Sequence, residues 1–140
     1  MLVEDFIVQL FNTADVAVFS GQARLLLISI NETIGNPKLT LYDAVRYSWH
    51  VSQDRAGGAE YVLAVAHGMI VGVFEAEEWL RAEKTNFLDI SDEHGNWNDQ
   101  EGRFGFRGHQ APDDIQRLYR GKRIPDEHRP GQNPIHYVNC

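Results

Sequence analysis

Two apolar segments joined by a two-residue link constrain the fold of this chain most strongly. Residues 60–66 (EYVLAVA) and 69–79 (MIVGVFEAEEW) flank His67-Gly68, a connection of the kind that closes a β-hairpin with positive φ angles. Both faces of the first segment are apolar, so we expect its strand to lie in the middle of a sheet. The sequence therefore predicts a sheet built around an antiparallel hairpin.

Three more segments have the pattern of strands. Residues 24–31 (RLLLISIN) are short and apolar, and turn-forming residues follow them. Residues 103–107 (RFGFR) alternate, which would place Phe104 and Phe106 on one face of a half-buried strand. Residues 134–139 (PIHYVN) are predicted to form a terminal strand after an irregular segment rich in proline and glycine.

Three short helices are predicted around these strands. Residues 3–14 carry apolar side chains at helical spacing. A second helix is expected at residues 41–50, because the Thr40 hydroxyl can cap its first amides and Trp49 falls on its apolar face. A third, residues 113–120, follows a proline and begins with two carboxylates, which favour a helix N-terminus.

The remaining segments are predicted to be irregular. Residues 52–60 (SQDRAGGAE) read as a break, and residues 80–101 are polar and predicted to form a surface loop. The length of 140 residues suits a single domain. We expect an N-terminal helical arm at residues 1–23 and an α+β core at residues 24–140.

Cysteine content and hydropathy bear on the compartment. Cys140 is the only cysteine, so no disulfide can form within one chain, which fits a reducing cytoplasm. The apolar run at residues 25–28 is far shorter than the roughly 20 residues that span a bilayer. Acidic residues, rather than a basic signal region, follow Met1. We therefore expect a soluble cytoplasmic protein with no membrane partner.

Charge is distributed unevenly along the chain. The net charge is −7, which by itself argues against binding to nucleic acid. Residues 1–102 carry a net charge of −10, whereas residues 103–140 carry a net charge of +3. The C-terminal quarter therefore carries a charge of opposite sign to the rest of the chain.

Motifs for cofactors, metals and nucleophilic catalysis are missing from the sequence. Neither G-x-x-x-x-G-K-[ST] nor G-x-G-x-x-G is present, and no G-x-S-x-G elbow occurs. A calcium-loop frame from Asp89 has His94 where glycine is needed, and His128, His136 and Cys140 fit no zinc spacing. We expect no cofactor and no metal, and the pattern favours a protein that is not an enzyme.

A cluster of carboxylates at Glu75, Glu77 and Glu78 keeps one catalytic alternative open. A glutamate such as Glu75 could act as the base of a small hydrolase with a nucleotide substrate. Acidic clusters are usually exposed, so a solvated strand end is the structural interpretation of the same residues.

Arginine and aromatic residues are the remaining chemical signal. Guanidinium groups make bidentate contacts to phosphate, and aromatic rings stack on bases. A tryptophan on an apolar helix face is more often part of the core, and cations at a helix C-terminus also stabilise the helix. The residues concerned are Arg46, Trp49, Arg55, Trp79, Arg103, Arg107, Arg117, Arg120, Lys122, Arg123 and Arg129.

Several stretches together resemble a known bacterial region. LLLISIN, LYDAVRYSWHVSQDRAGGAEYVLAVAHGMIVGVFEAEEW and LYRGKRIPDEHRPGQNPIHYVN are similar to an uncharacterised region on the C-terminal side of GIY-YIG endonuclease modules of the LEM-domain nuclease type. The resemblance covers most of residues 25–139. It points to Arg46, Trp49, Arg55, Tyr61, Gly68, Trp79, Gly121, Lys122, Gln132, Asn133, Pro134, Tyr137 and Asn139.

The chain departs from that family pattern in three places. Tyr47 stands where the pattern has glycine, and residues 56–58 replace basic residues expected after Arg55. The GIY-YIG module itself is absent, so cleavage is not implied. The hairpin, short helices and returning strand also resemble small PUA-like barrels, which include readers of modified bases. The expected fold is therefore α+β, a small mixed or antiparallel PUA-like barrel with short flanking helices.

Two functions follow as hypotheses. The first is a non-catalytic module that recognises nucleic acid or a nucleotide, beside a nuclease module or as a homo-oligomer. Trp49 would stack on a base, and Gln132 and Asn133 would contact a base edge. Phosphate would be held by three cations, Arg46, Arg55 and Lys122. The alternative is a protein-interaction or structural accessory domain without nucleic-acid contact, in which these residues brace the fold.

Overall fold

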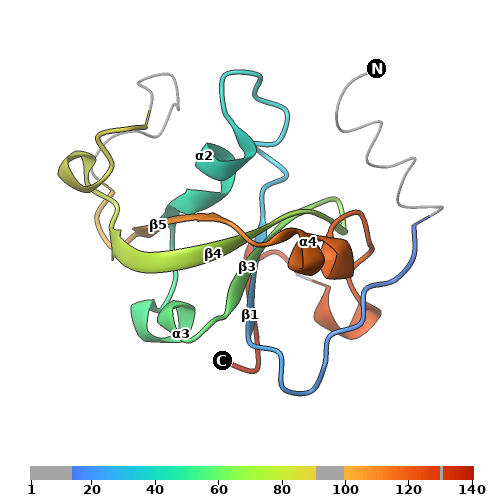
Figure 1. The fold of residues 1–140 in the computed structure, drawn as a ribbon. Coiled ribbons are helices and arrows are strands. Elements are labelled where there is room, and N and C mark those ends of the chain that lie inside the picture. The colour runs from blue at the N-terminus through green and yellow to red at the C-terminus, as the bar shows by residue number, and fades with distance from the viewer. Residues whose placement is uncertain (1–13, 91–99, 130) are drawn as a thin grey trace.

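The computed structural model describes residues 14–90, 100–129 and 131–140, and its ribbon is shown in Figure 1. Six strands carry most of the structure: β1 (Leu25–Ser29), β2 (Tyr47–Trp49), β3 (Tyr61–Ala66), β4 (Met69–Arg81), β5 (Phe104–Gln110) and β6 (Ile135–Val138). The helices are short: α2 (Leu41–Arg46), α3 (Gln53–Gly57) and α4 (Asp113–Tyr119), with 3₁₀ turns η1 (Lys84–Asn86) and η3 (Asp126–His128).

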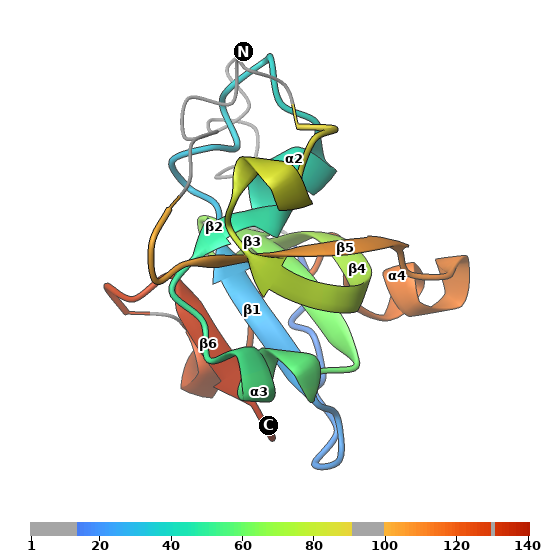
Figure 2. The ribbon, with the colours of Figure 1, turned by 90° about the vertical axis from the view of Figure 1, so that its left-hand side faces the viewer.

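The strands form one mixed sheet in the order β2-β5-β4-β3-β1-β6. β1 and β3 are parallel, and every other neighbouring pair is antiparallel. The sheet curls into a half-barrel, so that β4 and β5 cross the direction of β1 (Figure 1). Helices α2 and α3 lie on opposite sides of the β4–β5 ribbon in both ribbon views (Figure 2). The predicted α+β class, a small barrel-like fold with short helices, is confirmed at this coarse level.

The hairpin prediction is confirmed in detail. His67 and Gly68 have φ angles of 50° and 81°, which match a two-residue turn with positive φ at both positions. β3 lies inside the sheet, between β1 and β4. Its alternate residues enter two different core clusters, as expected for a strand covered on both faces.

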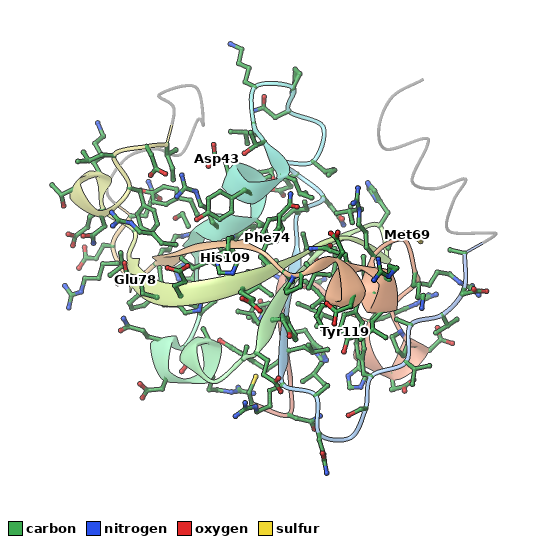
Figure 3. All side chains as sticks on the ribbon, in the orientation of Figure 1. Asp43, Met69, Phe74, Glu78, His109 and Tyr119 are labelled. Atoms are coloured by element: carbon green, nitrogen blue, oxygen red, sulfur yellow. The ribbon has the colours of Figure 1, made fainter. Side chains whose placement is uncertain are left out.

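Each face of the sheet buries its own core. One cluster includes Val45 from α2 together with Phe74 and Phe106 from the sheet. The other includes Tyr119 from α4 together with Leu63 and other residues. Phe74 and Tyr119 are labelled in Figure 3. Since all of these residues are at most 7% exposed, apolar burial on both faces stabilises the sheet.

Helix α2 is shorter than predicted. The Thr40 cap is confirmed, since its hydroxyl accepts a 3.1 Å hydrogen bond from the Asp43 amide. The helix ends at Arg46 instead of residue 50, because Tyr47 is extended and pairs with Gly105 on β5. Trp49 therefore belongs to β2, and its place on a helix face was predicted wrongly.

Two segments predicted to be irregular contain regular structure. α3 lies within residues 52–60, where the Ser52 hydroxyl caps the helix by accepting from the Arg55 amide. β4 continues to Arg81, and the following chain buries Phe87 and Ile90 beside Tyr47. Hydrophobic packing therefore organises the start of the predicted surface loop. Residues 91–99 of that loop lie outside the described residues.

The other elements agree with prediction except in length and in the N-terminal arm. β1, β6 and α4 are confirmed, and β5 continues beyond Arg107 to Gln110. The predicted helix at residues 3–14 lies, except for Ala14, outside the described residues. Residues 14–23 are not helical, because Asp15 and Ala17 hydrogen-bond the backbone of Arg123. None of the helices in the described residues has the length and apolar character needed to cross a membrane.

Candidate ligand-binding cleft

A cleft of about 460 Å³ opens at one end of the sheet, a size typical of small-molecule sites. Its walls come from the end of β1 and the turn after it, from β2, from the β3–β4 turn and from Arg103. Residues 129, 131, 132 and 134, on the approach to β6, close the remaining side. Segments distant in the sequence therefore meet around one hollow.

Strand direction explains why these segments converge. β1 and β3 are parallel, so their C-terminal ends lie at the same edge of the sheet. The Asn31 side chain fixes the turn by accepting a 2.8 Å hydrogen bond from the His67 amide. β6 is antiparallel to β1, so the chain before Ile135 reaches the same edge, where Pro134 O accepts from the Ser29 amide at 2.8 Å.

A backbone irregularity at Ser48 sets the position of Trp49. The register of β2 against β5 shifts between Tyr47 and Trp49, and Ser48 has a φ angle of 112°. Such bulges re-aim the side chains that follow them. The indole is then fixed by a 2.7 Å hydrogen bond from its Nε1 to Val45 O, and the half-buried ring lines the cleft.

The cleft carries two arginines and one carboxylate in its lining. Among the described residues, the Arg103 side chain donates one hydrogen bond, from Nη1 to Ser48 O at 3.0 Å, whereas a guanidinium can donate five. Arg129 contacts the exposed Asp126 at 3.3 Å. Glu32 supplies the opposing charge. The lining is thus more basic than a chain of net charge −7 would suggest.

Two buried polar atoms belong to residues of the cleft wall. Within the described part of the chain, Ser48 Oγ and His67 Nε2 have no hydrogen-bond partner. An unpartnered buried group costs about 1–3 kcal/mol, and a non-glycine residue with positive φ, such as Ser48, adds strain. Such costs cluster at functional sites, which supports this cleft as the site to test.

Of the six predicted ligand-binding residues, Trp49 and Gln132 line the cleft, whereas Arg46, Arg55, Lys122 and Asn133 do not. Asn133 accepts a 3.0 Å hydrogen bond from the Ile135 amide, so it caps the start of β6. The Lys122 amide donates to Tyr119 O and Lys122 O accepts from the Ile70 amide, which places Lys122 just after α4. In the described part of the chain, the hollow that Trp49 lines therefore includes neither Arg55 nor Lys122.

Arg46 lies in the interior. Its side chain is 2% exposed, and it contacts Asp43 Oδ1 at 2.8 Å and Asp89 Oδ2 at 3.1 Å. The guanidinium also lies 4.4 Å from the centroid of the Tyr42 ring. Burial alone lowers the pKa of Arg46, but the contacts with Asp89 and Asp43 raise it above its ordinary value. Arg46 is therefore a paired structural charge and not a free phosphate contact.

Arg103 and Arg129 belonged to the basic residues noted in the sequence, yet their grouping with Trp49 was not predicted. Arg103 directly precedes β5, and only the pairing of β2 with β5 brings it beside Ser48. That pairing was hidden by the expectation of a continuous helix through Trp49. Predicting a strand at residues 47–49 would have been needed to find this pairing.

A second polar cluster lies on β4 and β5. His109 is placed between Glu75 and Glu77, with its Nε2 and Nδ1 at 2.8 and 2.9 Å from the two carboxylates. Figure 3 labels His109 on β5. Hydrogen bonds to Glu75 and then Glu77 raise the pKa of His109. Both ring nitrogens of His109 are hydrogen-bonded, and one of these bonds is to Glu75. This arrangement therefore gives no support to Glu75 as a hydrolytic base.

A third cluster pairs two histidines. His128 Nδ1 and His136 Nε2 are 3.2 Å apart. Burial, and then the neighbouring His128, lower the pKa of His136. Across residues 14–90, 100–129 and 131–140, no three His, Cys, Asp or Glu side chains are grouped so as to hold a metal ion.

The cleft thus combines an indole, two guanidinium groups and the primary amides of Asn31 and Gln132. These groups can stack on a flat ring, hold phosphate and hydrogen-bond to a base edge. The chemistry that they support is recognition of an anionic ligand that contains a planar ring. In comparisons with known proteins, no family model, no curated protein and no solved structure matches this chain.

Proposed function

We propose that this protein is a non-catalytic module that binds nucleic acid or a nucleotide in the cleft described above. The observation that carries the proposal is the meeting of Trp49, Arg103, Arg129 and Gln132 in one hollow of about 460 Å³. The net charge of the protein is −7, so its overall electrostatic field repels an anion at long range. Within the basic and aromatic hollow, however, an anion would be attracted.

Each group has a defined role in the proposal. Trp49 stacks on a base, a contact worth about 1–3 kcal/mol. Arg103 and Arg129 hold phosphate oxygens, and the Gln132 amide offers a donor and an acceptor to a base edge. Because Nε1 of Trp49 is already hydrogen-bonded to Val45 O, little ring freedom is lost on binding.

The finer fold and the biological context form part of the proposal. A curled mixed sheet with short helices is compatible with a PUA-like architecture, and the resemblance to the region beside GIY-YIG modules suggests an accessory role next to a nuclease. Fold similarity alone does not imply an activity. We therefore base the ligand assignment on the cleft.

A structural or protein-interaction role is the second candidate. It is favoured by Arg46 and Arg55, two predicted phosphate contacts that instead pair within the chain. Under this candidate the protein self-associates or requires a partner. Light scattering at several concentrations distinguishes it, because a strict monomer that binds oligonucleotides would contradict it.

Fluorescence anisotropy with labelled single-stranded oligonucleotides tests the proposed function. Binding at about 50 mM salt should weaken steeply as salt is raised, and Arg129→Ala should reduce the slope by about 0.7 per lost phosphate contact. Arg103→Gln should act similarly, and Trp49→Leu should weaken binding roughly 5- to 150-fold. Arg117→Ala, an exposed arginine on α4 outside the cleft lining, is the control. No binding by the wild-type protein at this salt concentration would refute the proposal.

A further inference from the structure

A second hollow lies directly beside the first. It has a volume of about 660 Å³, and its lining includes Arg81, Glu83, Glu101, Arg103 and Phe104. Arg103 lines both hollows. The two hollows therefore adjoin at one guanidinium group.

Local structure fixes Arg103 at this boundary. Its amide donates to Gln100 O at 3.1 Å, which closes a turn in which Gly102 has a φ angle of 77°. Its side chain donates to Ser48 O at 3.0 Å on β2. Figure 2 shows β2 beside the start of β5. Held by both contacts, the guanidinium keeps its place between the hollows.

Each hollow also contains one half-buried aromatic ring. Trp49 lines the first hollow and Phe104 lines the second. The two residues are cross-strand partners in the pairing of β2 with β5. Side chains of directly paired residues lie close together, so the ring that lines the first hollow and the ring that lines the second are neighbours.

We infer that the ligand is a single-stranded polynucleotide of at least two nucleotides, which crosses from the first hollow to the second past Arg103. This inference rests on the proposed function. Aromatic stacking requires unpaired bases, and successive bases of a single strand stack on successive aromatic rings. The phosphate that joins the two nucleotides would lie at Arg103.

The charged residues that line the second hollow should affect the binding of longer strands but not of a mononucleotide. Glu83 and Glu101 oppose Arg81 and Arg103 there, so the extension of the strand is held less strongly than its first nucleotide. Removing an acid from this hollow should strengthen binding of longer strands, whereas removing Arg81 should weaken it. Neither change should alter the binding of a mononucleotide.

The test is affinity against ligand length. Thymidine monophosphate and oligothymidylates of two, three, four and six nucleotides are titrated into the full chain, and each affinity is divided by the number of registers the strand offers. We expect a gain of tenfold or more from one to three nucleotides, followed by a plateau. Arg81→Ala should lower the trinucleotide affinity several-fold, and Glu101→Gln should raise it.

The outcomes separate the inference from the proposed function. Arg81 and Glu101 are exposed, so their substitution should leave the fold intact, and Glu127→Gln, exposed and outside both hollows, is the matched control. Equal affinity for mononucleotide and hexanucleotide, still sensitive to Arg129→Ala, would overturn the inference and leave the proposed function standing. A length effect unaltered by Arg81→Ala and Glu101→Gln would also overturn it. No binding of any ligand overturns both.

Discussion

The guanidinium carbon of Arg55 lies 3.9 Å from the centroid of the Tyr137 ring. The same guanidinium donates two hydrogen bonds, of 3.1 and 2.9 Å, to Cys140 O. Tyr137 is in turn held by the other end of α3, since its hydroxyl accepts a 2.8 Å hydrogen bond from the Ser52 amide. Arg55 therefore fastens α3 to β6 and the residues after it.

The first prediction concerns this contact between α3 and β6. Arg55→Ala should lower the free energy of unfolding by about 1–2 kcal/mol, because an exposed cation–π contact and hydrogen bonds from a charged group are lost. Urea unfolding followed by circular dichroism measures the change. Arg55→Lys should lose less, since it keeps the charge but not the planar fork.

Oligonucleotide affinity separates the structural role of Arg55 from a binding role. Because Arg55 lies outside the cleft lining, Arg55→Ala should leave the salt dependence of binding unchanged. A slope reduced as much as in Arg129→Ala, with unchanged stability, would restore the phosphate contact predicted from the sequence.

The second prediction concerns the buried charge of Arg46. Arg46→Met should destabilise the protein by about 1–3 kcal/mol, because the guanidinium loses its contacts with Asp43, Asp89 and the Tyr42 ring. The exposed pair of Arg24 and Glu60, 3.6 Å apart, supplies the control, and Arg24→Met should cost less than about 1 kcal/mol. Equal losses in the two variants, measured by urea unfolding, would contradict the assignment of Arg46 to the core.

Elements with strong local signals were predictable from the sequence. The hairpin around His67-Gly68, the apolar strand β1 and the capped start of α2 all follow from patterns within a few residues. The end of α2 was not predictable, because it is decided by the pairing of β2 with β5, which is distant in the sequence. An added Cβ at Gly105 would lie 2.7 Å from Arg46 O, so the close approach of β5 to the end of α2 requires glycine at this position.

The candidate site was only partly predictable for the same reason. Trp49 and Gln132 were identified, but Arg46 and Arg55 were assigned to phosphate from residue type alone. Residue type cannot tell a paired arginine from an unpaired one. In the fold, Arg46 meets Asp43 one helical turn away and Asp89 much further along the chain, and the latter contact depends on the packing of Phe87 and Ile90.

The third prediction is a pH dependence that arises at His109. Its pKa is raised in the folded protein by hydrogen bonds to Glu75 and Glu77. A raised folded-state pKa means that the stabilisation is complete below the ordinary value of 6.5 and is lost as pH rises through the folded-state pKa. His109→Gln should therefore be less stable than wild type in acid, and the difference should vanish in alkali.

NMR titration of the His109 ring provides the direct measurement. Glu75→Gln should bring the pKa of His109 closer to its ordinary value, since the larger of the two hydrogen-bond contributions is weakened. The effect should shrink at high salt because the cluster is exposed. Stability profiles of wild type and His109→Gln that run parallel across about pH 5–9 would contradict this prediction, because they would show that folding causes no proton uptake at His109.

The fourth prediction concerns the strained residue of the cleft wall. Ser48 combines a φ angle of 112° with a buried hydroxyl that has no hydrogen-bond partner among the described residues. Ser48→Gly removes both costs, about 1–3 kcal/mol each, against a loss of roughly 0.5–1 kcal/mol from greater freedom of the unfolded chain. It should therefore stabilise the protein by about 1–5 kcal/mol in urea unfolding. Ser48→Ala removes only the hydroxyl and should gain less.

If the bulge aims Trp49 into the cleft, Ser48→Gly should also weaken oligonucleotide binding while it raises the free energy of unfolding. A Ser48→Gly protein that is less stable than wild type would show that Ser48 is not strained.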